Sequence, residues 1–242
     1  MKIIKVILPV NCPDEWLDDT AGSLNAVKDA DTELSVGKIP WGPPVIEQHY
    51  DDIWAELPTL LEAEKAEREG YDGVLIQCAG DPAVRAIREK LSIPTVGLME
   101  AAVHLAYILG RRFSIITTLE AGVAATEDLL RLYDCTTRCV SIRVLGLTVQ
   151  ELMDKEKTFD ATLREADISV KQDRADVLIM GCALMTGLQD VIMERLGVPV
   201  IEPHIAALKA TEDLIAMRLS HSRLAYHAPQ NNSRTLPGGV GV

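Results

Sequence analysis

An internal repeat constrains this chain of 242 residues more than any other feature of its sequence. The segment DGVLIQCA at 72–79 aligns without a gap with DVLIMGCA at 176–183, so Cys78 and Cys182 occupy the same place in the two copies. After one inserted residue the match continues through EKLSIPTV and ERLGVPVI, whose prolines stand at positions 94 and 199. Two copies of one unit predict two similar halves, because each copy specifies the same supersecondary structure.

The pattern of hydrophobic residues predicts the structure of each half. Short runs rich in Val, Ile and Leu alternate with longer amphipathic segments, which is typical of a parallel sheet covered on both faces. We expect strands at 3–8, 33–38, 73–77, 95–97, 112–117, 139–143, 177–181 and 198–202. We expect helices at 50–69, 83–90, 101–109, 121–132, 161–173, 188–195 and 205–223. The fold class is therefore α/β, with two pseudo-symmetric Rossmann-like halves, each a small parallel sheet flanked by helices.

The division of the chain follows from the repeat. Residues 1–98 together with 205–228 are expected to form the first half, and residues 99–204 the second. The last long helix is expected to cross back onto the first half. The ligand crevice of such sheets lies at the carboxyl ends of the strands, which places the active site between the halves. The tail at 229–242 has no hydrophobic periodicity, so we expect a flexible arm there.

Composition excludes several classes of function. The net charge of -12 argues against a nucleic-acid partner. We expect no membrane segment, because no apolar run approaches the roughly 18 residues of a spanning helix. The apolar stretch at the amino terminus is too short for a signal peptide, which favours the cytoplasm. Five cysteines are an odd set that favours reduced thiols. No metal-ligand spacing or nucleotide-binding motif is present, so we expect a small-molecule substrate and no cofactor.

The repeated cysteines are the strongest candidates for chemistry. Each ends a strand and precedes a turn into a helix; after Cys78, Asp81 is the expected N-cap and Pro82 the first helical residue. The positive end of a helix dipole predicts a thiol pKa lowered from about 8.5 toward neutrality. A lone cysteine is most often a small buried hydrophobe. Two at equivalent positions of facing halves would instead flank a ligand, so that one thiolate removes a proton from a carbon stereocentre and the opposite thiol returns one.

The anion formed by such a proton transfer, next to a carbonyl, has to be held by hydrogen bonds. The candidate donors are the backbone amides after each cysteine, the hydroxyls of two threonines that end a strand, and one asparagine amide: Ala79, Gly80, Ala183, Leu184, Thr117, Thr118 and Asn11. Capping of a helix is an equal alternative for the threonines, and a turn is one for the asparagine. His49, His104 and His204 are expected at the surface or in packing.

Five segments carry a resemblance to a known family: GPPVIEQHYD at 42–51, CAGDP at 78–82, GLMEAA at 97–102, LGRRFSIITT at 109–118 and GCA at 181–183. Together they resemble the hydantoin and allantoin racemase branch of the aspartate/glutamate racemase superfamily, over nearly the whole chain before the tail. The resemblance implies two pseudo-symmetric α/β halves with a cysteine from each at their junction. It also implies cofactor-independent proton transfer at C5 of a hydantoin-type ring, and a homo-oligomer.

Two departures concern the substrate. The chain has PVNCPD at 9–14 where the family usually has Asn-Pro-Asn-Thr, and Leu184 where glycine is usual. The substrate need not be that of a typical hydantoin racemase. Cys12 ends a strand in the altered loop, where a buried or incidental thiol is the stronger expectation and a place in the lining of the crevice is the alternative. The motifs of the amino-acid racemases are absent, which argues against aspartate or glutamate as substrate. Two alternatives stay open: a cysteine-dependent cis-trans isomerase of a small dicarboxylate, of the maleate type, and a two-lobed small-molecule binding protein.

Overall fold

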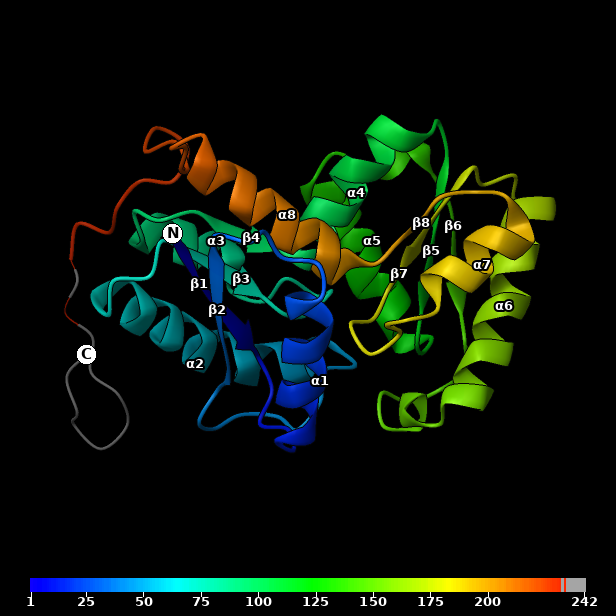
Figure 1. Cartoon of the computed structure of the whole chain (residues 1–242), viewed down its shortest axis with the longest axis horizontal. Helices are drawn as coiled ribbons and strands as arrows, with labels where there is room; N and C mark the ends of the chain where they lie inside the picture. The colour runs from blue at the N-terminus through cyan, green and yellow to red at the C-terminus, as the bar shows by residue number, and fades with distance from the viewer. Residues whose placement is uncertain (232, 234–242) are drawn as a thin grey trace.

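Two four-stranded parallel sheets form the framework of the molecule (Figure 1). The computed structural model describes residues 1–231 and 233; residues 232 and 234–242, most of the arm expected at 229–242, lie outside the described residues. The first sheet has the order β2-β1-β3-β4 and the second β6-β5-β7-β8. The strands are β1 Lys2–Leu8, β2 Thr32–Lys38, β3 Gly73–Ile76, β4 Thr95–Gly97, β5 Phe113–Thr117, β6 Cys139–Val144, β7 Val177–Met180 and β8 Val200–Ile201. The α/β class and the two similar halves are confirmed.

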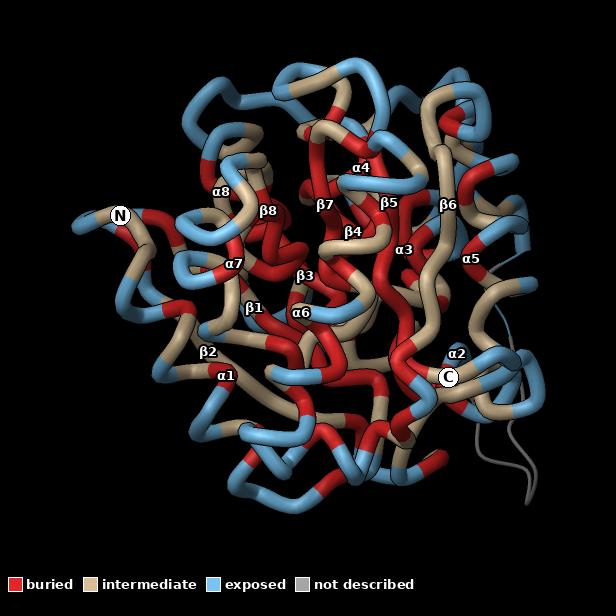
Figure 2. Tube along the Cα trace, turned by 90° about the vertical axis from the view of Figure 1, so that its right-hand side faces the viewer, coloured by how far each residue is buried: buried red, intermediate tan, exposed pale blue. Residues whose placement is uncertain are grey.

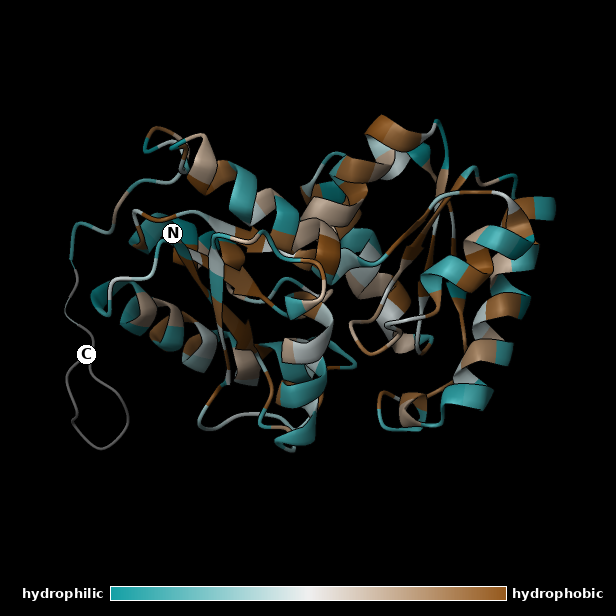
Figure 3. Ribbon diagram, in the orientation of Figure 1, coloured by the Kyte–Doolittle hydropathy of each residue, from teal (hydrophilic) through white to brown (hydrophobic). Residues whose placement is uncertain are grey.

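Helices flank both sheets (Figure 3) and alternate apolar with polar residues along their length. They are α1 Glu15–Asn25, α2 His49–Arg68, α3 Val84–Lys90, α4 Leu98–Leu109, α5 Ala121–Leu132, α6 Lys155–Lys171, α7 Gln189–Leu196 and α8 Pro203–Ala216, with short 3₁₀ helices at Thr136–Arg138 and Glu151–Met153. Helix α2 leaves Ile53, Trp54 and Leu57 exposed. Figure 2 shows that burial is concentrated in the strands other than the edge strands β2 and β6, which are mostly intermediate, while the helices and connecting loops carry most of the exposed residues.

The structure adds one helix and corrects the bounds of two predicted ones. Helix α1 was not predicted; its buried face has only Trp16, Thr20 and Leu24. Helix α6 begins at Lys155 rather than 161, since the side chain of Asp154 caps it by accepting the N–H of Lys157. The predicted helix at 205–223 ends at Ala216, and a left-handed residue follows at position 218.

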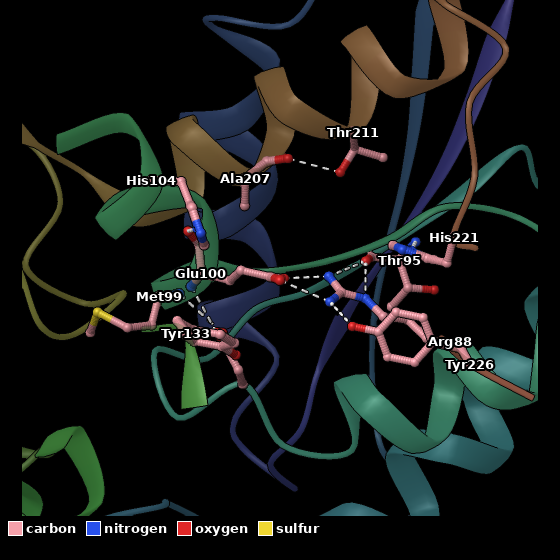
Figure 4. Close-up of polar contacts among 11 residues, drawn as sticks. Arg88, Thr95, Met99, Glu100, His104, Tyr133, Ala207, Thr211, His221 and Tyr226 are labelled. Carbon is pink, nitrogen blue, oxygen red and sulfur yellow. Dashed lines mark hydrogen bonds and ion pairs between the residues drawn. The ribbon is translucent and has the colours of Figure 1, made fainter. Parts of the chain in front are cut away.

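Helix α8 follows the second sheet in sequence but packs against α4 and against β1, β3 and β4 of the first sheet. The residues after α8 then cover the turn between α3 and β4. The ring of His221 accepts the N–H of Thr95, and the guanidinium of Arg88 donates to the carboxylate of Glu100 and the hydroxyl of Tyr226 (Figure 4). The proposed division of the chain into two domains stays a prediction.

Gly181 is required by close backbone packing at the end of β7. A Cβ at this position would lie 2.6 Å from the carbonyl oxygen of Ile116, which belongs to the neighbouring strand β5. We expect Gly181→Ala to lower the free energy of unfolding by ~1–3 kcal/mol, because backbone cannot move aside as a flexible side chain can. Gly22, in α1, has open space around its Cβ position. Gly22→Ala is the matched control, expected to raise stability by about 0.5–1 kcal/mol in chemical denaturation.

Candidate active site

A cavity of about 120 Å³, partly open to solvent, lies between the two sheets. It is lined by residues that follow the carboxyl ends of β1, β3, β5 and β7, together with the loop before α2. Its apolar wall is part of a hydrophobic cluster to which Leu8 and Trp16 contribute from the first half and Val149 and Leu184 from the second. The repeat therefore brings equivalent strand ends of the two halves to one cavity.

Cys78 and Cys182 both line this cavity, one from each half. Their loops begin with the same turn: the N–H of Asp81 donates to the carbonyl of Cys78, and the N–H of Met185 to that of Cys182, at 3.1 Å in both cases. Each sulfur also accepts a backbone N–H, from Gly80 at 3.4 Å and from Leu184. The two thiols thus have matched surroundings and face one space.

The expected lowering of the thiol pKa is wrong. Helix α3 has Ala83 as its N-cap and α7 begins only at Gln189, so neither sulfur lies at a helix amino terminus. Burial raises the pKa of Cys182 to about 11, and it raises the pKa of Cys78 further. The N–H groups that reach each sulfur oppose this rise without overcoming it. Both groups are therefore mainly thiols at neutral pH.

Most of the other predicted site residues come to the same cavity. Its walls include Ala79, Gly80, Thr117, Thr118, Ala183 and Leu184. Neither threonine caps α5, whose N-cap is Glu120 without a side-chain hydrogen bond, so the capping alternative is wrong. Asn11 does not line the cavity; it is exposed, and its backbone N–H donates to the carbonyl of Pro43. Cys12 is buried, as expected, and also lies outside the lining.

Six polar residues of the cavity were not singled out from the sequence: Thr20, Glu47, Gln48, Asp52, Gln77 and Thr126. One oxygen of Asp52 and the side-chain oxygen of Gln77 are buried without a hydrogen-bond partner. A methyl group placed on Gly80 would lie 3.5 Å from that Asp52 oxygen and 3.6 Å from the sulfur of Cys78, so the carboxylate and the thiol border the same volume. In a chain this acidic, nothing in the sequence distinguishes these carboxylates from solvated ones.

The electrostatics of the cavity are set by acidic groups. Burial raises the pKa of Asp52 to about 6, while nearby His49, 3.7 Å away, opposes the rise. The carboxylate of Glu47 accepts the N–H of Val149 at 2.8 Å and so links the two halves across the cavity mouth. Among the described residues around the cavity, none is Lys or Arg. The described lining therefore combines carboxylates, hydroxyls and thiols and has no Lys or Arg to pair with an anionic ligand.

The histidines lie outside this cavity. His49 and His104 are exposed, and His204 is buried in the first turn of α8, where burial lowers its pKa to about 4. No group of three His, Cys, Asp or Glu side chains in the described part of the chain is arranged to hold a metal ion. Within residues 1–231 and 233, no helix is both long and apolar enough to cross a membrane.

Comparison with known proteins gives a consistent result. The family model for Asp/Glu/hydantoin racemases matches residues 17–211. The hydantoin racemase from Pseudomonas sp. strain NS671 is 33% identical to this chain over 90% of both chains. The hydantoin racemase from Paenarthrobacter aurescens is also 33% identical, over 93% of this chain and 97% of that protein. The structure of allantoin racemase from Klebsiella pneumoniae aligns with a TM-score of 0.90 at 29% identity, over 99% of this chain and 98% of that one. Arylmalonate decarboxylase, at 16% identity and a TM-score of 0.66, shares the fold.

Proposed function

This chain belongs to the Asp/Glu/hydantoin racemase family and is an isomerase of the racemase class, and we propose that it interconverts the two enantiomers at C5 of a hydantoin-like ring. Cys78 and Cys182 are the proposed acid and base. The observation that carries the proposal is that equivalent strand ends of the two halves bring both thiols to one cavity.

In the proposed reaction, the thiolate of one cysteine takes the C5 proton and becomes a thiol. The electron pair left on C5 delocalises into the adjacent ring carbonyl, and the hydroxyls of Thr117 and Thr118 are the proposed donors to that oxygen. The opposite cysteine gives its proton to the other face of C5 and becomes the thiolate. One turnover therefore exchanges the protonation states of the two cysteines and consumes no other reactant.

The polar groups of the cavity favour a neutral ring with N–H groups over a dicarboxylate. A buried acceptor without a partner costs about 1–3 kcal/mol, and a ligand N–H removes that cost. The unpartnered oxygens of Asp52 and Gln77 are such acceptors. A dicarboxylate or an amino acid would instead bring a carboxylate toward Asp52 and Glu47 with no Lys or Arg of the lining to pair with it. This argues against a maleate-type isomerase. Assembly into a homo-oligomer stays a prediction.

A substrate panel tests the proposed function. We expect loss of optical rotation with each enantiomer of a 5-alkylhydantoin, and no activity on maleate or on L-aspartate or L-glutamate at the same concentration. The rate without enzyme is subtracted, because hydantoins racemise slowly in base. Turnover of maleate, or a covalent adduct of maleate on either cysteine by mass spectrometry, would overturn the proposal. Binding of the hydantoin without racemisation would favour the binding-protein alternative.

A further inference from the structure

A buried carboxylate holds the loop that follows Cys78. The side chain of Asp81 is 6% exposed and accepts three hydrogen bonds, from the backbone N–H of Met99 at 3.0 Å, the N–H of Glu100 at 2.9 Å and the hydroxyl of Tyr133 at 2.8 Å. Figure 4 shows these three partners together at the amino end of α4. The predicted role of Asp81 as N-cap of the next helix is therefore wrong. It ties the Cys78 loop to α4 and to the second half instead.

A second buried carboxylate holds the loop that follows Cys182. Glu202 is also 6% exposed and is the N-cap residue of α8. Its carboxylate accepts the backbone N–H of Gly187 at 2.8 Å and also that of Gln189, both in the loop between Cys182 and the first turn of α7. Each catalytic loop thus depends on one buried acidic side chain.

The repeat relates two positions in each half: the third residue after the cysteine and the third residue after the matched proline. The first half has its carboxylate at the former position, and the second half has it at the latter. Asp81 and Met185 correspond, since each donates its N–H to the carbonyl of the cysteine three residues earlier. Gly97 and Glu202 correspond, since each lies three residues after the matched proline at the end of the last strand of its sheet. The first half therefore has Asp with Gly, and the second has Met with Glu.

Gly97 is required because no side chain fits beside Asp81. A Cβ on Gly97 would lie 2.4 Å from the carboxyl carbon of Asp81, so the first half has no room for a side chain where the second half has Glu202. In each half, one carboxylate fills the space between the loop after the cysteine and the end of the last strand. In the first half it comes from the loop, as Asp81, and in the second half from the residue after the strand, as Glu202.

Neither carboxylate lines the cavity, so neither can touch a substrate directly. Both fix loops whose backbone N–H groups contact the two sulfurs. We propose that Asp81 and Glu202 are a matched pair of positioning residues, each setting the orientation of the cysteine in its own half. This inference rests on the proposed function and names the groups that hold its two bases.

The test uses single-cysteine enzymes. Asp81→Asn is placed in a Cys182→Ser background, which keeps Cys78, and Glu202→Gln in a Cys78→Ser background, which keeps Cys182. Proton exchange at C5 of each hydantoin enantiomer is followed by NMR in deuterated water. We expect each substitution to slow exchange by the remaining cysteine at least tenfold. The crossed combinations, Asp81→Asn with Cys182 and Glu202→Gln with Cys78, should stay within about twofold, because each carboxylate holds only its own loop.

Controls separate positioning from general loss of stability. Asp72 and Asp176 are also equivalent in the repeat, and each accepts backbone N–H groups, of Ile3 and of Arg112, at the opposite ends of the strands. Asp72→Asn and Asp176→Asn should lower stability without a preference for either cysteine. If Asp81→Asn does not fold, Tyr133→Phe removes one donor to Asp81 and should act in the same direction by a smaller factor.

A second readout does not depend on the substrate. The alkylation rates of Cys78 and Cys182 by iodoacetamide are measured on the otherwise native chain by peptide mass spectrometry. Asp81→Asn should change the rate at Cys78 at least threefold and leave Cys182 unchanged, and Glu202→Gln the reverse. Equal effects on both cysteines, or effects no larger than those of the Asp72 and Asp176 variants, would overturn the inference. Absence of exchange in both single-cysteine enzymes would overturn the proposed function instead.

Discussion

Replacing either cysteine of the cavity by serine is expected to lower racemisation by at least about 10²-fold, since a general acid or base contributes 10² to 10⁴. Serine keeps the shape of the site, but its hydroxyl cannot serve as a base near neutral pH. Cys78→Ser and Cys182→Ser should each still exchange the C5 proton of one enantiomer for deuterium. The enantiomer should differ between the two variants, because each remaining thiolate reaches one face of the ring. Chiral chromatography and NMR of the recovered hydantoin measure both quantities.

The buried thiol that does not line the cavity provides the control. Cys12→Ser should keep racemisation within about threefold, because Cys12 lies outside the cavity wall. If both cavity variants retain full racemase activity, proton transfer between Cys78 and Cys182 is wrong. If both variants exchange the same enantiomer, the two sulfurs do not act on opposite faces of the ring.

The kcat/KM for racemisation is expected to rise about tenfold per pH unit between pH 7 and pH 9, or about 100-fold overall. Burial raises the pKa of Cys182 to about 11 and that of Cys78 further, so the thiolate of the free enzyme is a minor species in this range. Below the pKa of a base, each unit of pH changes its ionised fraction about tenfold. The profile is measured on a 5-alkylhydantoin after subtraction of the uncatalysed rate at each pH.

A plateau at or below pH 8 would contradict this expectation. It would mean that one cysteine has a pKa near neutrality, as a helix amino terminus beside the sulfur would produce. Alkylation of each cysteine as a function of pH gives the same comparison without substrate. Thermal unfolding at each pH shows whether a change in rate reflects the cysteines or the stability of the chain.

Much of the fold could be predicted because the signals are local. The repeated strands are continuous apolar runs, and a cysteine follows each of them at the same place. Because similar halves present equivalent strand ends to a common crevice, the sequence predicted that Cys78 and Cys182 would both face it. Helix α1 was missed for the converse reason: its buried face has only three residues, one of them Thr20. Asn11 was placed in the site by its position after a strand, but its loop turns it toward solvent.

The acidic residues of the site show where local signals end. In the sequence, Asp52 and Glu47 have no feature that distinguishes them from carboxylates exposed to solvent. Only the packing of α2 and its preceding loop brings them to the cavity. Asp81 stands directly before a proline, the signature of an N-cap, yet its partners Met99 and Tyr133 are 18 and 52 residues away. A local pattern cannot compete with long-range donors that offer the same carboxylate more hydrogen bonds.

By itself, the sequence determined that two equivalent α/β halves bring one cysteine each to a common crevice, because a repeat imposes the same strand, turn and helix twice. Tertiary structure alone decided the state of those cysteines. The pKa of a thiol depends on how much water surrounds it, and the burial of both sulfurs depends on residues that the two halves bring together. The same holds for Asp81 and Glu202: the repeat gives their positions, but only the tertiary structure shows which backbone N–H groups their carboxylates accept.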